Sequence, residues 1–126
     1  MARLDYGGDV LWLHLSLLER FGASVRQDLA VPLTSVSSVR VTQHVWGELR
    51  GIRSPGTLLR GVLALGTRRH PLGRDFVAVY GKGPALVIEL AGARFLRLVV
   101  SSPDAAGVAD EIRSAVSEAR VLSRSD

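Results

Sequence analysis

Four short apolar runs separated by turn residues limit what the second half of this chain can fold into. The runs are 61–67, 75–80, 85–90 and 95–101, and each segment between them contains glycine or proline. Short runs at near-regular spacing with turn signals are typical of an antiparallel sandwich or barrel. We therefore predict four neighbouring strands in this part of the chain.

Three further strands are predicted in the first half. Leucine alternates with other residues over 10–17, which indicates a half-buried strand, although some of these leucines also match the spacing of a helix. The second strand is expected over 28–32 and the third over 39–43, with a connection of one helical turn at 18–27. Residues 1–9 are expected to be a flexible leader.

The pattern changes to that of a helix after the last apolar run. Ser102 is a capping residue and Pro103 suits a first helical turn. Apolar residues then recur every four positions from Val108 to Val116, with acidic residues between them, as in an amphipathic helix. The sequence predicts a single domain over 10–122 that ends in this helix, followed by a frayed polar tail at 123–126.

Composition excludes several classes of function. The chain has 126 residues and no cysteine, so it is long enough for one cored domain and has no thiolate chemistry or disulfide. It has no apolar run long enough to span a membrane, and its first residues do not match a signal peptide. A cytoplasmic protein is therefore expected, with peripheral contact at the inner membrane face as a further option.

The positive charge is concentrated in one region. Between residues 47 and 74 there are six arginines and one acid, Glu48, whereas the formal charge of the whole chain is only +4. Residues 44–60 have no clean periodicity and include Pro55 and several glycines, which predicts a long loop of the kind that often carries function. A turn is predicted at 68–74. This basic region is the best candidate for contact with an anionic partner.

Five segments that together span much of the chain also carry a resemblance to a known family. They are VPLTSVSSVRV (31–41), LRGIRSPGT (49–57), GVLALGTRR (61–69), GRDFVAVYGKGPALVIEL (73–90) and ARFLRLVVS (93–101). Most of the chain thereby resembles the bacterial pleckstrin-homology-like proteins common in actinobacteria. The resemblance implies a mainly β fold, namely a bent antiparallel barrel of about seven strands that is capped by the C-terminal amphipathic helix.

The same resemblance implies a small scaffold that binds lipids, peptides or protein surfaces, and some bacterial relatives assemble into oligomers. Members that bind phosphoinositides use several lysines and arginines after the first strand. Here that connection offers Arg20 and Arg26, which are offset by Glu19 and Asp28. No lipid-binding residue is carried over from the family for this reason.

No catalytic, metal or cofactor site is expected. The three histidines are far apart in the sequence and lack partners at the spacing of metal ligands. Gly81-Lys82-Gly83 lacks the serine or threonine of a phosphate loop and is followed by Pro84, so it is interpreted as a hairpin turn. Asp75 and Glu89 are interpreted as a turn residue and a solvent-facing strand residue, rather than as a catalytic pair.

The leading hypothesis is a non-enzymatic binding module that recognises a protein, a peptide or an anionic membrane surface. The candidate binding residues are Trp46, Arg50, Arg53, Arg68, Arg69 and Arg74. The alternative for these arginines is a solvated face, or side chains that hold the loop by bonding its own carbonyl groups. A self-assembling structural protein and a small enzyme with an unrecognised site are the other functions considered, and nucleic acid is not an expected partner.

Overall fold

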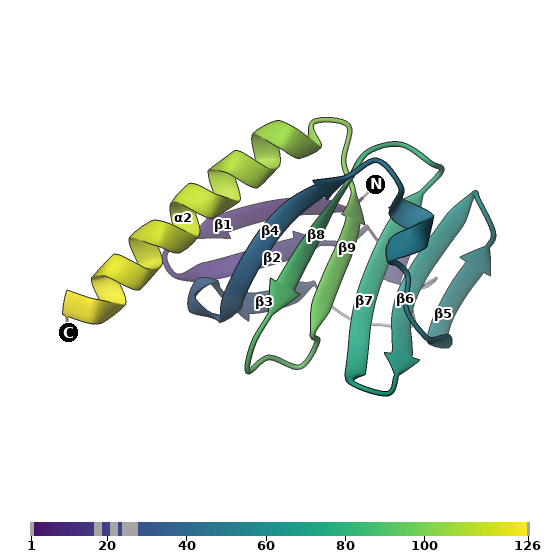
Figure 1. The fold of residues 1–126 in the computed structure, drawn as a ribbon, viewed down its shortest axis with the longest axis horizontal. Coiled ribbons are helices and arrows are strands. Elements are labelled where there is room, and N and C mark those ends of the chain that lie inside the picture. Colours follow the sequence, from purple (N-terminus) through teal and green to yellow (C-terminus); the bar gives the residue numbers. More distant parts are fainter. Residues whose placement is uncertain (1, 17–18, 21–22, 24–27, 126) are drawn as a thin grey trace.

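The structure is a computed structural model that describes residues 2–16, 19–20, 23 and 28–125, and the side chains of residues 53–55 and 123–125 are outside this description. Its described residues form nine strands, two 3-10 helices (η) and one long C-terminal helix (Figure 1). The elements are β1 Arg3–Gly7, β2 Val10–His14, β3 Leu29–Pro32, η1 Leu33–Ser35, β4 Val36–Thr42, η2 Val45–Glu48, β5 Ile52–Leu59, β6 Leu63–His70, β7 Gly73–Tyr80, β8 Ala85–Leu90, β9 Arg97–Ser101 and α2 Ala105–Ser125. The predicted mainly β class with one C-terminal helix is confirmed.

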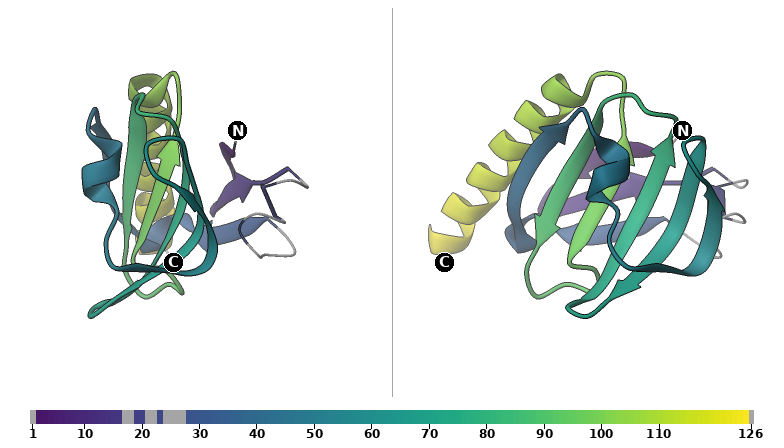
Figure 2. Two further views of the ribbon diagram at one scale, coloured as in Figure 1. Left: turned by 90° about the vertical axis from the view of Figure 1, so that its right-hand side faces the viewer. Right: turned by 45° about the vertical axis from the view of Figure 1, so that its right-hand side comes forward.

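The strands form two sheets that pack against each other. The small sheet has the order β1-β2-β3, and the large sheet has the order β4-β8-β9-β7-β6-β5. The small sheet lies on one face of the large sheet, which we call the inner face, and η2 lies on the opposite, outer face (Figure 2). Apolar residues of both sheets and of α2 form one main core on the inner side, and a second, smaller cluster lies under η2.

The described strands do not close into the predicted barrel, and they are not all antiparallel. β9 lies between β8 and β7, antiparallel to the first and parallel to the second. After β7 the chain forms β8, which pairs with β4, and it then returns to insert β9 between β8 and β7. These three strands are buried on both faces because the large sheet is covered on both faces. Their side chains therefore lack the alternation that would specify the strand order.

The predicted loop at 44–60 is mostly regular structure. It contains η2 and the eight-residue strand β5, which pairs with β6 and has a register shift between Arg53 and Gly56. Proline and glycine inside a strand are tolerated at an edge strand with a bulge, and they hid this strand in the sequence. The predicted turn at 68–74 is also shorter than expected, because β6 continues to His70 and β7 begins at Gly73.

Two regions near the N-terminus also differ from expectation. Residues 3–7, inside the expected flexible leader, form β1 and pair along their whole length with β2. β2 ends at His14, before the predicted end of that strand at 17. The second strand, β3, starts within one residue of its predicted position. The helical turn predicted in the connection 18–27 lies largely outside the described residues.

Helix α2 covers one edge of the large sheet. Its buried face is mostly alanine, together with Ile112 and Val116, so the helix approaches the sheet closely. The Arg113 guanidinium donates to the Val39 carbonyl at 3.0 and 2.6 Å, and Arg120 donates to the Val36 carbonyl. An exposed strand edge invites pairing with other chains. These two arginines occupy carbonyl groups of the β4 edge.

The helix begins later than the sequence predicts. Its first residue is Ala105, and the Asp104 carboxylate accepts a hydrogen bond from the Gly107 backbone N–H at 3.4 Å. Asp104 therefore caps the helix in place of Ser102, because aspartate bonds the unpaired N–H groups of a first turn equally well. At its other end the helix backbone continues to Ser125, through most of the expected frayed tail.

Two glycines with similar φ angles, one of them just before β5, test how closely the chain entering β5 approaches the end of β6. Gly51 has φ +70° and Gly81 has φ +63°, yet a Cβ at Gly51 would lie 1.8 Å from the Arg69 carbonyl oxygen, whereas a Cβ at Gly81 meets nothing within 4 Å. We expect Gly81→Ala to cost about 1 kcal/mol of unfolding free energy for its left-handed backbone, and Gly51→Ala to cost at least about 3 kcal/mol. Urea unfolding measures both. Equal losses would contradict the close approach.

Candidate functional site

One row of polar residues crosses the outer face of the large sheet. Strand register places one residue from each of the six strands in this row, which we call the polar row. From β4 to β5 it consists of Ser38, Glu89, Arg97, Asp75, Arg68 and Arg53. Opposite charges in neighbouring strands stabilise a sheet. The charges alternate in sign from Glu89 to Arg68, and the last two residues of the row, Arg68 and Arg53, are both arginines.

Asp75 is the buried centre of the row. It is 1% exposed, and its two carboxylate oxygens accept hydrogen bonds from Nε and Nη2 of Arg50, each at 2.7 Å. His70 Nε2 lies 2.9 Å from Oδ1, and His70 Nδ1 accepts a hydrogen bond from the Leu72 N–H, so Nε2 is assigned as the donor to Asp75. Burial raises the pKa of Asp75, but the hydrogen bonds from Arg50 and His70 outweigh it and hold the pKa below its usual value.

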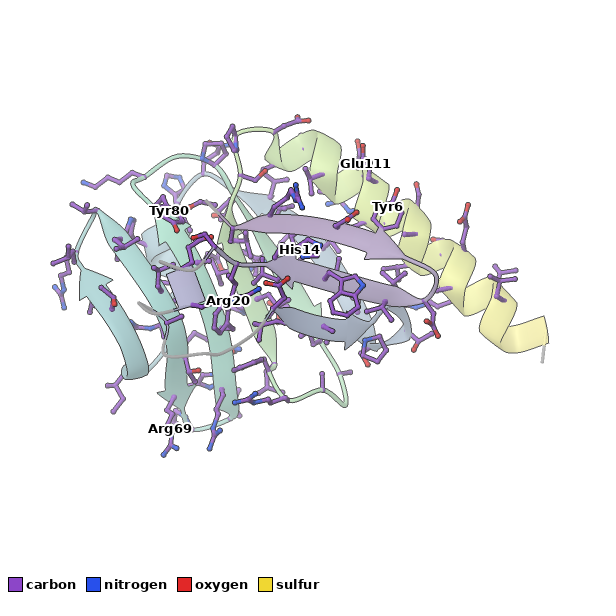
Figure 3. The ribbon with its side chains drawn as sticks, turned by 180° about the vertical axis from the view of Figure 1, so that it is seen from behind. Tyr6, His14, Arg20, Arg69, Tyr80 and Glu111 are labelled. Carbon is purple, nitrogen blue, oxygen red and sulfur yellow. The ribbon has the colours of Figure 1, made fainter. Side chains whose placement is uncertain are left out.

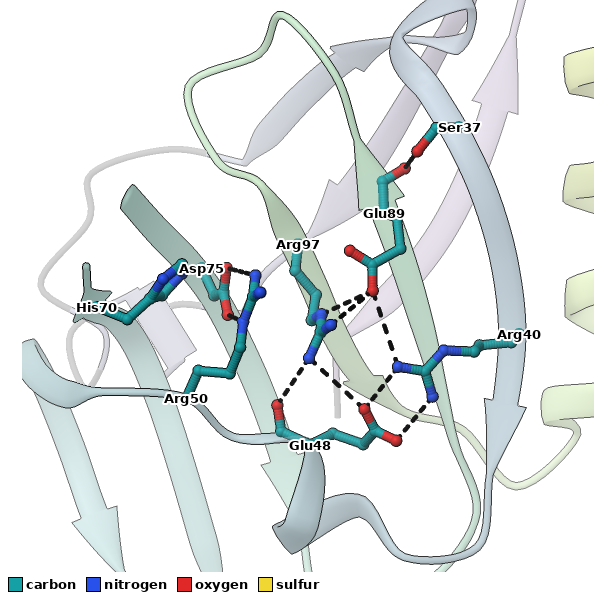
Figure 4. A network of polar contacts seen from close by, with 8 residues as sticks. All are labelled: Ser37, Arg40, Glu48, Arg50, His70, Asp75, Glu89 and Arg97. Carbon is teal, nitrogen blue, oxygen red and sulfur yellow. Dashed lines mark hydrogen bonds and ion pairs between the residues drawn. The ribbon is translucent and has the colours of Figure 1, made fainter. Parts of the chain in front are cut away.

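A second group of ion pairs fastens η2 to the same face (Figure 4). The Glu48 carboxylate accepts hydrogen bonds from both terminal nitrogens of Arg40, each at 2.7 Å. Arg97 donates Nε to Glu89 at 2.8 Å and Nη1 to the Glu48 carbonyl at 3.2 Å. The hydrogen bonds from Arg40 lower the pKa of Glu48. Together with the Asp75–Arg50 pair, these contacts hold residues 48–50 against the sheet, and we call the whole set the arginine clamp.

Three of the six predicted binding residues hold the protein's own backbone or a buried acid. Arg50 is taken up by Asp75. Arg68 donates Nε to the Arg50 carbonyl at 3.0 Å and Nη2 to the Gly51 carbonyl at 2.7 Å. The Trp46 indole donates to the Gly81 carbonyl at 2.8 Å. Arg68 thus matches the alternative interpretation, in which an arginine holds this segment by bonding its own carbonyl groups. The side chain of Arg53 is outside the described part of the structure.

The last two predicted residues, Arg69 and Arg74, lie elsewhere. They pair directly across the β6–β7 hairpin and are both exposed, with Ile52 of β5 paired to Arg69 and Leu72 in the turn. We call Ile52, Arg69, Leu72 and Arg74 the arginine tip, and Figure 3 shows Arg69 at this end of the sheet. Strand alternation turns Arg68 to the outer face and Arg69 to the inner face. The structure therefore separates the five predicted residues with described side chains into two sites.

The sequence-based predictions missed the residues that bond to these arginines and the other members of the clamp. Asp75 was placed at the start of the strand 75–80 but was interpreted as a turn residue, which is wrong, because β7 begins two residues earlier and buries it. Its partner His70 and the clamp residues Arg40 and Arg97 were not singled out. The available signal was a charged residue within each otherwise apolar strand. The order of the strands was needed to see that these residues are neighbours on one face of the sheet.

A further buried contact was also missed. Ser16 and Glu19 form a reciprocal capping box, in which the Ser16 N–H donates to the Glu19 carboxylate at 2.9 Å and the Glu19 N–H donates to the Ser16 hydroxyl at 3.2 Å. The Tyr80 hydroxyl donates to the same carboxylate. Burial is the larger cause that raises the pKa of Tyr80, and this hydrogen bond raises it further. The Ser-x-x-Glu spacing in the sequence was the signal for this cap.

The carboxylates considered as a catalytic pair do not face each other. Asp75 and Glu89 share the polar row, but Arg97 on β9 lies between them and bonds to Glu89. Within the described residues, no group of three histidine, aspartate or glutamate side chains is placed to hold a metal ion. Arg50 and His70 bond to the Asp75 carboxylate and Arg97 bonds to the Glu89 carboxylate, as in a structural clamp.

No helix of the described structure has the length and apolar character needed to cross a bilayer. Comparisons with protein-family models, with curated proteins and with solved structures find no match for this chain.

The two kinds of arginine are expected to differ in their effect on stability. Arg50→Gln leaves the buried Asp75 with only His70, and we expect a loss of about 3 kcal/mol in unfolding free energy. Arg74→Gln removes an exposed charge at the arginine tip and should change it by less than about 0.5 kcal/mol. Urea unfolding at neutral pH measures both variants. If the two changes were equal, Arg50 would not be part of a clamp.

Proposed function

We propose that the protein is a non-enzymatic binding module, of pleckstrin-homology-like kind, that docks on an anionic membrane surface through the arginine tip. The observation that carries this proposal is the pairing of two exposed apolar side chains with two adjacent exposed arginines at one end of the large sheet. The relationship to pleckstrin-homology-like proteins is supported by the order of elements, a run of strands followed by one C-terminal helix. The open, partly parallel large sheet departs from that fold.

Arg69 and Arg74 are an unfavourable pair in the isolated protein. Like charges directly opposite each other in two antiparallel strands destabilise the sheet. Neither arginine forms an ion pair with an acid in the described part of the chain, and the nearest acid along β7, Asp75, faces the opposite side of the sheet and bonds to Arg50. An anionic surface placed against the tip supplies the missing negative charge to both.

The apolar side chains of the tip suit the same partner. Leu72, in the β6–β7 turn, is 77% exposed, and Ile52, which pairs with Arg69, is 71% exposed. Exposed apolar side chains beside cations allow shallow insertion below lipid headgroups while the guanidinium groups stay at the phosphates. Each arginine near an anionic membrane contributes about 1 kcal/mol to binding.

The neighbouring loop extends the basic surface. The Leu96 N–H donates to the Arg74 carbonyl at 2.8 Å, so the β8–β9 loop lies beside the tip. Two residues earlier in this loop, the exposed Arg94 lies over the Phe95 ring, 5.1 Å from the ring centroid. The tip is a projecting hairpin turn (Figure 1), which fits a flat surface better than it fits a peptide, since peptides bind in grooves or along open strand edges.

Self-assembly remains the second candidate, and one observation favours it. β5 is the edge strand of the large sheet at the end opposite to β4 and α2, and it exposes Ile52 and Leu59. An uncovered edge strand is a template for pairing with a second copy. The register shift within β5 opposes such pairing, because bulges twist an edge away from a partner. Size-exclusion chromatography with light scattering separates a monomer from an assembly.

Sedimentation with lipid vesicles tests the membrane proposal. We expect the protein to pellet with vesicles that contain phosphatidylserine, and not with vesicles of phosphatidylcholine alone. Arg69→Gln with Arg74→Gln should weaken the binding by about 30-fold, since two surface charges are lost. Leu72→Ser should weaken the part of the binding that survives at high salt, because salt screens the charges and leaves the apolar contact.

The pair Arg60→Gln and Lys82→Gln is the matched control, because it removes two positive charges near the opposite end of β6. This control should retain binding within a few-fold. Equal losses in both double variants would mean that net charge, rather than the tip, controls binding. The absence of pelleting at low salt would exclude a membrane partner and leave a protein or peptide as the target.

A further inference from the structure

A pocket of about 710 Å³ lies between η2 and the β5–β6 hairpin, on the outer face of the large sheet. We call it the η2 pocket. Its volume is in the range of small-molecule sites. The candidate ligand contacts that line it are His44, Trp46, Leu49, Leu58, Arg60, Arg68 and Lys82. Arg60 lies in the β5–β6 turn and Lys82 lies in the β7–β8 turn, whereas the arginine tip is at the β6–β7 turn, so the two sites use different residues.

One part of the pocket is a firm apolar wall. Trp46, Leu49 and Leu58 line it and also pack against the smaller apolar cluster of the large sheet. The hydrogen bond from the Trp46 indole to the Gly81 carbonyl fixes the orientation of the ring. The arginine clamp holds the segment that follows Trp46 against the sheet. A flat apolar group can therefore pack on a surface that is already ordered, which lowers the entropic cost of binding.

The other part of the pocket carries uncompensated positive charge. Arg60, Arg68 and Lys82 line it together with His44, and none of its described lining residues is acidic. Glu48 belongs to η2, but its carboxylate bonds to Arg40. Within the described structure, Arg60 and Lys82 form no ion pair, and Arg68 bonds to carbonyl groups through Nε and Nη2 only.

The pKa of Arg68 is consistent with an excess of positive charge in the pocket. Burial lowers the pKa of Arg68, and the positive charge of Arg60 lowers it further, against an opposing contribution from Asp75. Asp75 is already occupied by Arg50 and His70. An anion in the pocket would offset the repulsion between Arg68 and Arg60. Planar guanidinium groups suit phosphate oxygens in particular, because their N–H groups match the spacing of those oxygens.

We infer that the η2 pocket binds a small molecule that joins a phosphate group to a flat apolar ring. The ring packs on Trp46 and Leu58, and the phosphate lies among Arg60, Arg68 and Lys82. This class follows from the two halves of the pocket, because inorganic phosphate alone leaves the apolar wall exposed and a neutral ring leaves the cations unpaired. The inference does not rest on membrane docking.

Calorimetric titration with 1-naphthyl phosphate, 1-naphthol and inorganic phosphate tests the inference. We expect the first probe to bind at least about tenfold more tightly than either of the others, since each of the others uses one half of the pocket only. Arg60→Gln with Lys82→Gln should weaken 1-naphthyl phosphate binding by at least about tenfold. The matched control, Arg69→Gln with Arg74→Gln, should leave it unchanged.

The position of the probe is read from the two tryptophan indole signals in a ¹⁵N–¹H spectrum, with Trp12→Phe used to assign them. The Trp46 signal should shift on binding and the Trp12 signal should not, because Trp12 is on the exposed face of β2. No binding of 1-naphthyl phosphate, equal affinity for either control probe, or equal losses in the two double variants would each overturn the inference. None of these results depends on vesicle binding.

Discussion

The ion pair between Asp75 and Arg50 is the contact on which the outer side of the molecule depends. A carboxylate that is 1% exposed requires several good hydrogen-bond donors, and Asp75 receives them from Arg50 and His70. Arg50 comes from the segment after η2, and His70 comes from the end of β6. The same carboxylate thus joins the centre of the large sheet to the segment that crosses its outer face.

The position of this segment determines which positive charges stay available. With Arg50 on Asp75, and with Arg40 and Arg97 on Glu48 and Glu89, the acids of the outer face are occupied by the clamp. Among the other described cations of this region, Arg69 and Arg74 lie at the arginine tip, and Arg60, Arg68 and Lys82 line the η2 pocket. The basic region that is continuous in the sequence is therefore divided by structure into an internal clamp and two outward surfaces.

The sequence predicted the outline of the fold from local patterns. The strand over 85–90, the strand near 28–32 and the C-terminal helix were recognisable because each has a clear period and turn residues at its ends. β5 was not recognisable, because its proline, its glycine and its bulge resemble a loop when its partner β6 is unknown. Strand order was also beyond local patterns, since strands buried on both faces show no alternation.

The same limit explains the outcome for the candidate site. Residue type and charge identified the arginine-rich region, but they did not separate arginines that bind the protein itself from those that stay exposed. Arg68 and Arg69 are adjacent in the sequence and face opposite sides of the sheet, so one bonds to carbonyl groups and the other belongs to the tip. The partners that decide these roles, Asp75 and the carbonyls of Arg50 and Gly51, are brought near only by the pairing of strands.

The pH dependence of unfolding, compared between the natural protein and Asp75→Asn, tests whether a charged Asp75 holds the clamp. Because the folded-state pKa of Asp75 is lowered, its contribution is fully present above the unfolded-state pKa of about 4 and is lost as the pH falls through the folded-state value. We expect the natural protein to be more stable than the variant at pH 7, and the difference in unfolding free energy to shrink steadily below about pH 4. A difference that stays constant from neutral to acidic pH would contradict a charged, clamp-forming Asp75.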